Sequence, residues 1–215
     1  MTLLKRILTE FLGTAFLLMI VVGSGIMGES LAQGNVAVAL LANALATGAG
    51  LFVLIQCLGP ISGAHFNPVV SLLETFWGRL SRKDLIYYWG AQILGALIGV
   101  LMTHIMFGLP LFQVSTKVRL GLNLGFSEFV ATFGLICTIA LAGRKHVAFA
   151  PLTIACYITS AYWFTSSTSF ANPAVTLARA FTNTFCGIAP SGIAPFMIAQ
   201  ILGALGAFVF LRKII

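Results

Sequence analysis

The sequence predicts an all-α membrane protein with six transmembrane helices and two re-entrant half-helices, arranged as an inverted repeat. Three observations support this fold class. Hydrophobic residues make up 59% of the 215-residue chain and charged residues only 8%, whereas a soluble domain carries about 25% charged residues. Several apolar stretches are long enough to cross a bilayer. Two short Asn-Pro segments lie 105 residues apart, one in each half of the chain.

Apolar stretches of spanning length define the six predicted transmembrane helices. They occupy roughly residues 7–27, 36–58, 85–107, 125–142, 147–164 and 193–211. The first stretch follows Lys5-Arg6, as in a signal peptide, but Glu10 interrupts it early and no small-residue cleavage site follows. We therefore expect the first stretch to remain as a transmembrane helix.

The two Asn-Pro segments predict half-helices. Asn is a preferred N-cap and Pro is preferred at the first helical position, so helices are expected to begin at Pro68 and Pro173. They extend to about Phe76 and Phe181, and ~10 residues span ~15 Å, half of the hydrocarbon core. Non-helical backbone at membrane depth is tolerated only where protein buries it or water solvates it. Re-entrant loops that line an aqueous path meet this condition.

An internal repeat relates the two halves of the chain. The heptapeptide at residues 91–97 recurs at 199–205, and Glu10-Phe11 returns as Glu128-Phe129. Each half has three spans, and an odd number of spans inserts the two halves with opposite topology. The half-helices then enter from opposite faces and meet near the midplane. We expect one domain, residues 1–215, with inverted repeats at about 1–107 and 124–215.

The basic residues are distributed unevenly between the two faces. A formal net charge of +7 would favour a nucleic-acid partner in a soluble chain, but in a membrane protein basic residues mostly record orientation, so no such partner is predicted. By the positive-inside rule, the asymmetry predicts an inner-membrane protein with both termini in the cytoplasm. The amino-terminal side holds Lys5, Arg6, Arg79, Arg82, Lys83, Arg144, Lys145, Arg212 and Lys213, and the other side holds Lys117, Arg119 and Arg179.

Cysteine and histidine spacing gives no sign of a metal or catalytic site. The four cysteines have no paired spacing and are interpreted as small buried residues. The three histidines are scattered, without a His/Glu metal pattern, and no nucleophile elbow accompanies them. We therefore predict no catalytic residue and no metal. These residues are Cys57, Cys137, Cys156, Cys186, His65, His104 and His146.

Five motifs, in order along nearly the whole chain, carry a family resemblance. They are Glu10-Phe11-Leu12-Gly13-Thr14, Ser62-Gly63-Ala64-His65-Phe66-Asn67-Pro68-Val69, Gly90-Ala91-Gln92, Glu128-Phe129 and Phe170-Ala171-Asn172-Pro173-Ala174. Together they resemble the major intrinsic protein family, the aquaporins and glycerol facilitators. The resemblance implies passive, cofactor-free passage of water and small neutral solutes across the lipid bilayer, in a homotetramer with a pore in each protomer. It assigns the pore constriction to Asn67, Pro68, Val69, Asn172, Pro173 and Ala174.

The chain departs from the family pattern at the outer selectivity filter. The family usually places Arg after the second Asn-Pro-Ala, and this chain has Val175, followed by Thr176 where glycerol facilitators usually carry Asp. Family spacing assigns the other filter positions to Thr47, Ser160 and Ser169. We expect a small, neutral, hydroxyl-rich filter that passes glycerol, urea or metalloid acids such as arsenous acid. Bacterial members linked to arsenic resistance resemble this pattern. The first motif also departs, because Val69 replaces Ala, which we interpret as tolerated variation.

Elementary electrostatics describes how such a pore selects solutes. Each half-helix N-terminus presents unpaired N–H groups and about half a positive charge, so two tips at the midplane repel cations and protons. The Asn67 and Asn172 amides donate to neutral hydroxylic solutes, and the loop carbonyls accept from them.

The remaining polar residues have competing interpretations. Glu10 and Glu128 are proton-coupling acids or, as we favour, acceptors of backbone N–H groups that fix the re-entrant loops. Gln92 and Gln200 are assigned similar structural work between helices. His65 is either a satisfied structural residue or part of the cytoplasmic vestibule. Arg179 either supplies charge to the outer mouth or, as we favour, snorkels to the outer surface.

Three other functions compete with a wide solute channel. A water-selective aquaporin would have the same fold. A secondary transporter with inverted repeats would need coupling-ion ligands at the midplane, yet the acids lie near the ends of the spans. A membrane enzyme would need the catalytic spacing that the sequence lacks.

Overall fold

The structure of the protein is a computed structural model that describes residues 1–145 and 147–215. Among these residues, five helices are long and apolar enough to cross a membrane. Each coincides with one of the stretches predicted from the sequence. They are α1 (Leu3–Leu31), α2 (Val36–Ser62), α4 (Arg82–Met106), α5 (Leu122–Lys145) and α8 (Ile193–Ile214).

The sixth predicted span is shorter than the others. It consists of a 3₁₀ turn, η1 (Val147–Phe149), and a 15-residue helix, α6 (Ala150–Phe164). At 1.5 Å per residue the α-helical part covers ~22 Å, less than the ~30 Å hydrocarbon core. This shortness explains why α6 does not count among the five long spans.

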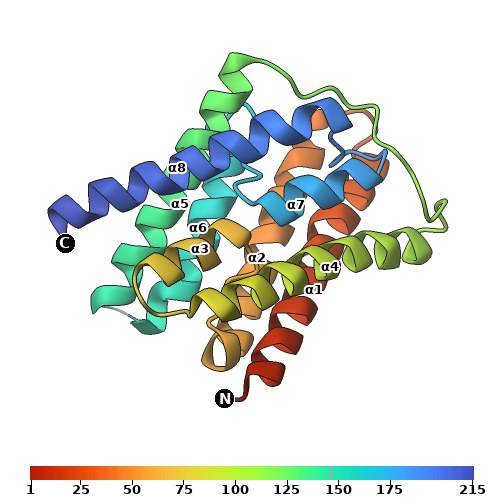
Figure 1. Ribbon diagram of the computed structural model, residues 1–215. Helices are drawn as coiled ribbons and strands as arrows, with labels where there is room; N and C mark the ends of the chain where they lie inside the picture. The colour runs from red at the N-terminus through yellow and green to blue at the C-terminus, as the bar shows by residue number, and fades with distance from the viewer. Residues whose placement is uncertain (146) are drawn as a thin grey trace.

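The two half-helices begin at the residues that the Asn-Pro pairs predict. They are α3 (Pro68–Phe76) and α7 (Pro173–Ala178), and α7 continues as the 3₁₀ turn η2 (Arg179–Phe181). Figure 1 shows both near the centre of the helix bundle. A further 3₁₀ turn, η3 (Pro190–Gly192), leads into α8, and the part of the chain that the structure describes contains no strand.

Glycines at equivalent positions let the helices of each half approach closely. A Cβ added at Gly95 would clash with the backbone carbonyl of Phe11, which brings α4 against α1. In the second half a Cβ at Gly203 would clash with the carbonyl of Phe129, which brings α8 against α5. Small residues at such crossings are common in membrane helices. The same helix pairing therefore occurs in both halves, as the sequence repeat predicts.

Both termini lie at the face of the bundle where α3 ends. Arg6, near the amino terminus, forms an ion pair of 3.1 Å with Asp84 at the start of α4. Near the carboxyl terminus, the Phe208 ring lies 5.5 Å from the ring of Phe76, the last residue of α3. The uneven distribution of basic residues in the sequence predicts that the two termini lie on the same face.

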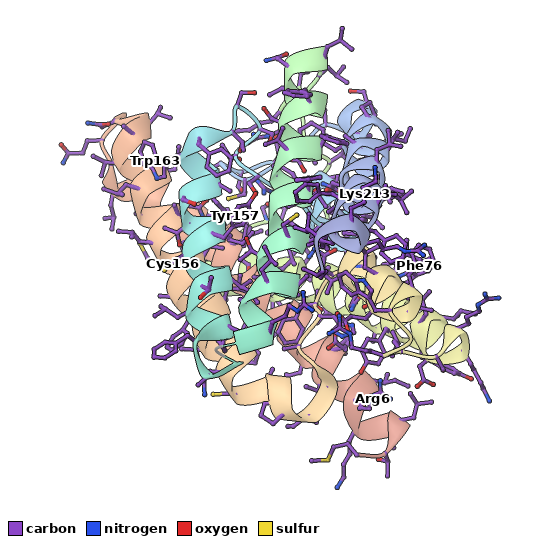
Figure 2. All side chains as sticks on the ribbon, turned by 90° about the vertical axis from the view of Figure 1, so that its left-hand side faces the viewer. Arg6, Phe76, Cys156, Tyr157, Trp163 and Lys213 are labelled. Atoms are coloured by element: carbon purple, nitrogen blue, oxygen red, sulfur yellow. The ribbon has the colours of Figure 1, made fainter. Side chains whose placement is uncertain are left out.

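The interpretation of the cysteines as buried residues is wrong for two of them. Cys57 and Cys156 are exposed, Cys137 is partly exposed and Cys186 is buried. Figure 2 shows the neighbouring Tyr157 between α6 and α5, where its hydroxyl donates to the Ala131 carbonyl at 2.9 Å. Apolar runs in a membrane bundle face lipid as well as the core, so an apolar neighbourhood does not determine which way a cysteine points.

Candidate functional site

A cavity of about 230 Å³ follows the two half-helices through the bundle. Asn67 and Asn172 lie on its wall, and apolar side chains of α1, α2, α5 and α6 form the opposite side. We call its two ends the α3 mouth, lined by His65 and Glu74, and the α7 mouth. The α7 mouth is lined by Thr47, Tyr162, Ser169, Val175 and Arg179.

The tips of the two half-helices are joined by reciprocal hydrogen bonds. The side-chain amide of Asn67 donates to the carbonyl of Ala171 at 2.8 Å, and that of Asn172 donates to the carbonyl of Phe66 at 2.8 Å. The amide oxygens cap their own helices, Asn67 accepting from Val69 N–H at 3.1 Å. Each amide retains a second N–H, and both side chains line the cavity.

The other four residues assigned to the constriction lie behind the cavity wall. Val69 and Ala174 are buried, at 2% and 1% exposure, and belong to the apolar clusters on either side of the junction. Pro68 and Pro173 occupy the first helical positions and are also buried. These residues hold the two tips together, whereas the asparagines face the cavity.

Left-handed backbone occurs at matching positions of the two re-entrant loops. Ala64 and Phe66 have φ of 51° and 48°, and Ser169 and Ala171, each 105 residues later, have φ of 49° and 48°. Non-glycine residues in this region cost about 1–3 kcal/mol each and persist only where surrounding contacts impose the conformation. The internal repeat therefore extends to the strained backbone itself.

Glu10 and Glu128 make the backbone hydrogen bonds expected of them. The Glu10 carboxylate accepts from the N–H groups of His65 at 3.0 Å and Phe66 at 2.7 Å. The Glu128 carboxylate accepts from Phe170 N–H at 2.9 Å and Ala171 N–H at 2.8 Å. Both carboxylates are fully buried. They fix the loops, and neither lines the cavity.

Gln92 and Gln200 complete the same network in each half. Gln92 Nε2 donates to Glu10 at 2.9 Å and to Ser71 Oγ at 2.8 Å. Gln200 Nε2 donates to Glu128 at 2.6 Å and to the Thr176 hydroxyl at 2.8 Å. Thr176, the position where glycerol facilitators carry Asp, therefore faces this network.

The expected filter composition is wrong at Ser160. Ser160 is exposed and donates to the Tyr157 carbonyl at 2.8 Å, so it does not reach the cavity. Tyr162 lines the α7 mouth instead, with its hydroxyl 3.3 Å from that of Thr47. In a helix, two residues two positions apart differ by about 200° in direction, so the two side chains cannot both face the cavity. Counting by family spacing did not take this helical phase into account.

The α7 mouth is also not neutral, because Arg179 lines it. Arg179 is 2% exposed, so the interpretation that it snorkels to the surface is wrong. Its Nε donates to the Cys186 carbonyl, and its guanidinium lies over the Phe170 ring, 3.3 Å from the centroid. The other two small filter residues, Thr47 and Ser169, are present at this mouth together with Val175.

Arg119, in the connection between the halves, was missed as a site residue. Its Nε donates to the Gly187 carbonyl at 2.9 Å, and its guanidinium lies 5.2 Å from the Phe170 centroid. Burial, together with the charge of Arg179, lowers the pKa of Arg119 to about 10. Arg119 therefore remains positive at neutral pH. Only the path of the loop brings it to the Phe170 ring beside this mouth, and no motif in the sequence marks it.

The α3 mouth combines an imidazole and a carboxylate. His65 lines the cavity and its Nδ1 lies 2.9 Å from Ser71 Oγ, so it is both a satisfied residue and a vestibule residue. Glu74 also lines the cavity and forms an ion pair of 3.0 Å with Arg79. Glu74 lies six residues after Pro68, and no pattern in the sequence marks it as a residue of the cavity wall.

The other histidines do not add to the site. His104 is buried and its ring nitrogens lie 2.9 Å from the Leu111 carbonyl and from the Thr182 hydroxyl. His146 lies outside the residues that the structure describes. Within the described ranges, no group of three or more His, Cys, Asp or Glu could hold a metal ion.

Inverted repeats, two re-entrant half-helices and a cavity along their junction define a class of helical membrane channels. The model of the major intrinsic protein family matches residues 1–171, and the chain belongs to this family. It is 52% identical over 210 residues to aquaglyceroporin AqpS of Rhizobium meliloti (strain 1021), covering 98% of this chain and 90% of that protein. Aquaporin Z of Brucella melitensis biotype 1 is 38% identical over 104 residues, which is 48% of this chain and 45% of that protein.

A solved structure has the same fold. The X-ray structure of the aquaglyceroporin from Plasmodium falciparum aligns with a TM-score of 0.76 at 19% identity, covering 98% of this chain and 95% of that chain. The predicted fold class and family are thereby confirmed.

Proposed function

We propose that the protein is a passive membrane channel for water and small neutral solutes, and that its cavity is the permeation path. One observation carries the proposal. The tips of two oppositely directed half-helices meet through the reciprocal bonds of Asn67 and Asn172, on the wall of a cavity that continues to a mouth on either side. A solute between the mouths meets two amide donors on one side and apolar side chains on the other.

The midplane excludes ions without binding the solute tightly. The half-helix N-termini direct partial positive charge at the junction, which repels cations and protons. Neutral solutes exchange hydrogen bonds with water for bonds from the Asn67 and Asn172 amides and to the carbonyls of the re-entrant loops. Conduction requires such weak, multiple contacts, because a tightly bound solute would not leave.

The α7 mouth is the outer selectivity filter in this proposal. Val175 occupies the position of the family's usual arginine, which removes a bulky fork of donors beside Thr47 and Ser169. Tyr162 narrows the mouth on one side, and Arg179 provides a guanidinium one helical turn from Val175. We infer passage of glycerol, urea or metalloid acids such as arsenous acid in addition to water. The 52% identity to a protein named aquaglyceroporin supports this substrate class.

We further infer a homotetramer in the inner membrane, with both termini in the cytoplasm. The shared face of the two termini, with its basic residues Arg79, Arg82, Arg212 and Lys213, supports this orientation. Large apolar side chains exposed on the outer surface of the bundle support burial against lipid or neighbouring protomers.

A swelling assay in proteoliposomes tests the function. We expect glycerol and urea to enter faster than into empty liposomes, with a low activation energy and no dependence on an ion gradient. Water should pass in the same vesicles. A requirement for a coupling ion would favour the secondary transporter, and passage of water without glycerol or urea would favour the water-selective aquaporin.

A further inference from the structure

We propose that Glu74 is a second selectivity element, which rejects anions at the end of the path opposite the outer filter. The inference rests on the proposed channel function. The two mouths carry charges of opposite sign, with Arg179 on the cavity wall at the α7 mouth and Glu74 on the wall at the α3 mouth.

The α7 mouth attracts anions. The guanidiniums of Arg119 and Arg179 lie over the same ring, Phe170, at 5.2 Å and 3.3 Å from its centroid. Both donate to backbone carbonyls, and neither forms an ion pair with a carboxylate of the described residues. The nearby Glu128 carboxylate is occupied by Phe170 and Ala171 N–H groups. An anion that approaches this mouth therefore meets the Arg179 charge on the cavity wall, with Arg119 beside the same Phe170 ring but off the wall.

The midplane does not repel anions either. Both half-helix tips direct their positive ends at the junction, and the Asn67 and Asn172 amides present N–H donors. From the α7 mouth to the junction, the fixed charges thus favour an anion over a cation. Loss of hydration against the apolar wall is the opposing contribution.

Glu74 places a carboxylate on the cavity wall at the α3 mouth. Its side chain is only 12% exposed and is, among the described residues that line the cavity, the one with a negative charge. Its partner Arg79 is 59% exposed, lies 4.8 Å from the Trp77 centroid and is not part of the cavity wall. The Glu74 side chain therefore lies on the wall of the path, while most of the Arg79 side chain is exposed.

Of the residues that the structure describes, Glu74 is the one carboxylate on the wall at this mouth, and the arginines near it, Arg79 and Arg6, lie off the wall and are each held in an ion pair. Arg6 is paired with Asp84 at 3.1 Å, and His65 Nδ1 is bonded to Ser71 at 2.9 Å. An anion drawn in through the α7 mouth meets the carboxylate before it leaves, whereas a cation is repelled at the α7 mouth and at the junction. Only neutral molecules find no repulsive charge along the whole path.

Formate and glycerol fluxes in the same proteoliposomes test this role. At a pH of about 7.5 formate is almost fully ionised, because an ordinary carboxylic acid has a pKa of about 4. Glu74→Gln removes the charge and keeps the size of the side chain. We expect the potential-driven influx of the formate anion to rise at least about fivefold, while glycerol flux stays within about twofold of the unmodified protein.

Two further variants make the test specific. Glu74→Ala should give the same gain in formate flux, and adding Arg179→Gln to Glu74→Gln should remove most of that gain, because the attraction at the α7 mouth is lost. Glu29→Gln is the matched control, since Glu29 is an exposed acid outside the cavity, 3.7 Å from Lys117, and its neutralisation should leave both fluxes unchanged.

Unchanged formate flux in the two Glu74 variants, at normal glycerol flux, would overturn the inference and leave the channel intact. Absence of glycerol flux in the unmodified protein would instead overturn the proposed function. The two failures are therefore distinguishable.

Discussion

Position 175 shows how one side chain sets the width of a mouth. Val175 is buried at 5% exposure and lines the cavity beside Thr47 and Tyr162. Its branched aliphatic side chain offers neither donors nor charge, so the hydroxyls of Thr47, Tyr162 and Ser169 provide the polar contacts at this level. Ser169 Oγ is buried without a hydrogen-bond partner among the described residues, which leaves it free for a solute.

Changing Val175→Arg should narrow the α7 mouth and add a charge one turn from Arg179. We expect glycerol flux to fall at least about tenfold and water flux by less than about twofold, because the larger solute depends on the lost width. Swelling in glycerol and shrinkage in an impermeant osmolyte measure the two rates. Val175→Leu is the matched control, since it enlarges the side chain without charge and should have a smaller effect. Equal losses for both solutes would refute the assignment of the filter.

Among the elements, the re-entrant loops depend most on one residue each. The φ values near 50° at Phe66 and Ala171 persist because Glu10 and Glu128 accept the backbone N–H groups at these positions. A carboxylate has only acceptor oxygens, so it can accept several N–H donors together. An amide in its place would offer an NH₂ group to a backbone N–H, which is a repulsive pair.

Glu10→Gln should therefore destabilise the protein by about 2 kcal/mol, the cost of a buried donor left unsatisfied. For a chain of this size that corresponds to a fall of about 4–8 °C in the apparent melting temperature. Thermal unfolding in detergent measures it. Because the second half repeats the contact, Glu128→Gln should have an effect of similar size. If neither variant were less stable than Glu29→Gln, the carboxylates would not be fixing the loops.

At the scale of the whole molecule, the sequence predicted the features that its internal repeat marks and missed the residues that only tertiary structure brings to the cavity. The Asn-Pro pairs and the Glu-Phe motifs predicted both half-helices and the carboxylates behind them, because local capping preferences determine where these helices begin. Ser160 was chosen by spacing along the chain, whereas helical phase brings Tyr162 to the cavity. Glu74 reaches the α3 mouth, and Arg119 the Phe170 ring beside the α7 mouth, only through tertiary structure, which no local pattern encodes.

The orientation of the molecule gives a further prediction. If both termini are cytoplasmic, a cysteine placed at Lys213 should be protected from a membrane-impermeant thiol reagent in intact cells, and one placed at the partly exposed residue Gln113 should react. The natural cysteines are first replaced, because Cys57 and Cys156 are exposed on the bundle. Permeabilised cells serve as the control for reactivity at Lys213. The reverse labelling pattern would place the termini outside.

The exchange of amide and carbonyl between Asn67 and Ala171, and between Asn172 and Phe66, joins the two halves at their most constrained backbone. Neither half can form these hydrogen bonds alone, because the asparagine of each half donates to a backbone carbonyl of the other half. A fragment that ends at the central connection would keep the three long helices α1, α2 and α4 and the half-helix α3. The side-chain amide of its Asn67 would then lack the Ala171 carbonyl to which it donates. The fragment can rebuild the junction only by meeting a second copy inserted in the opposite orientation, so it should form a junction only as an antiparallel pair.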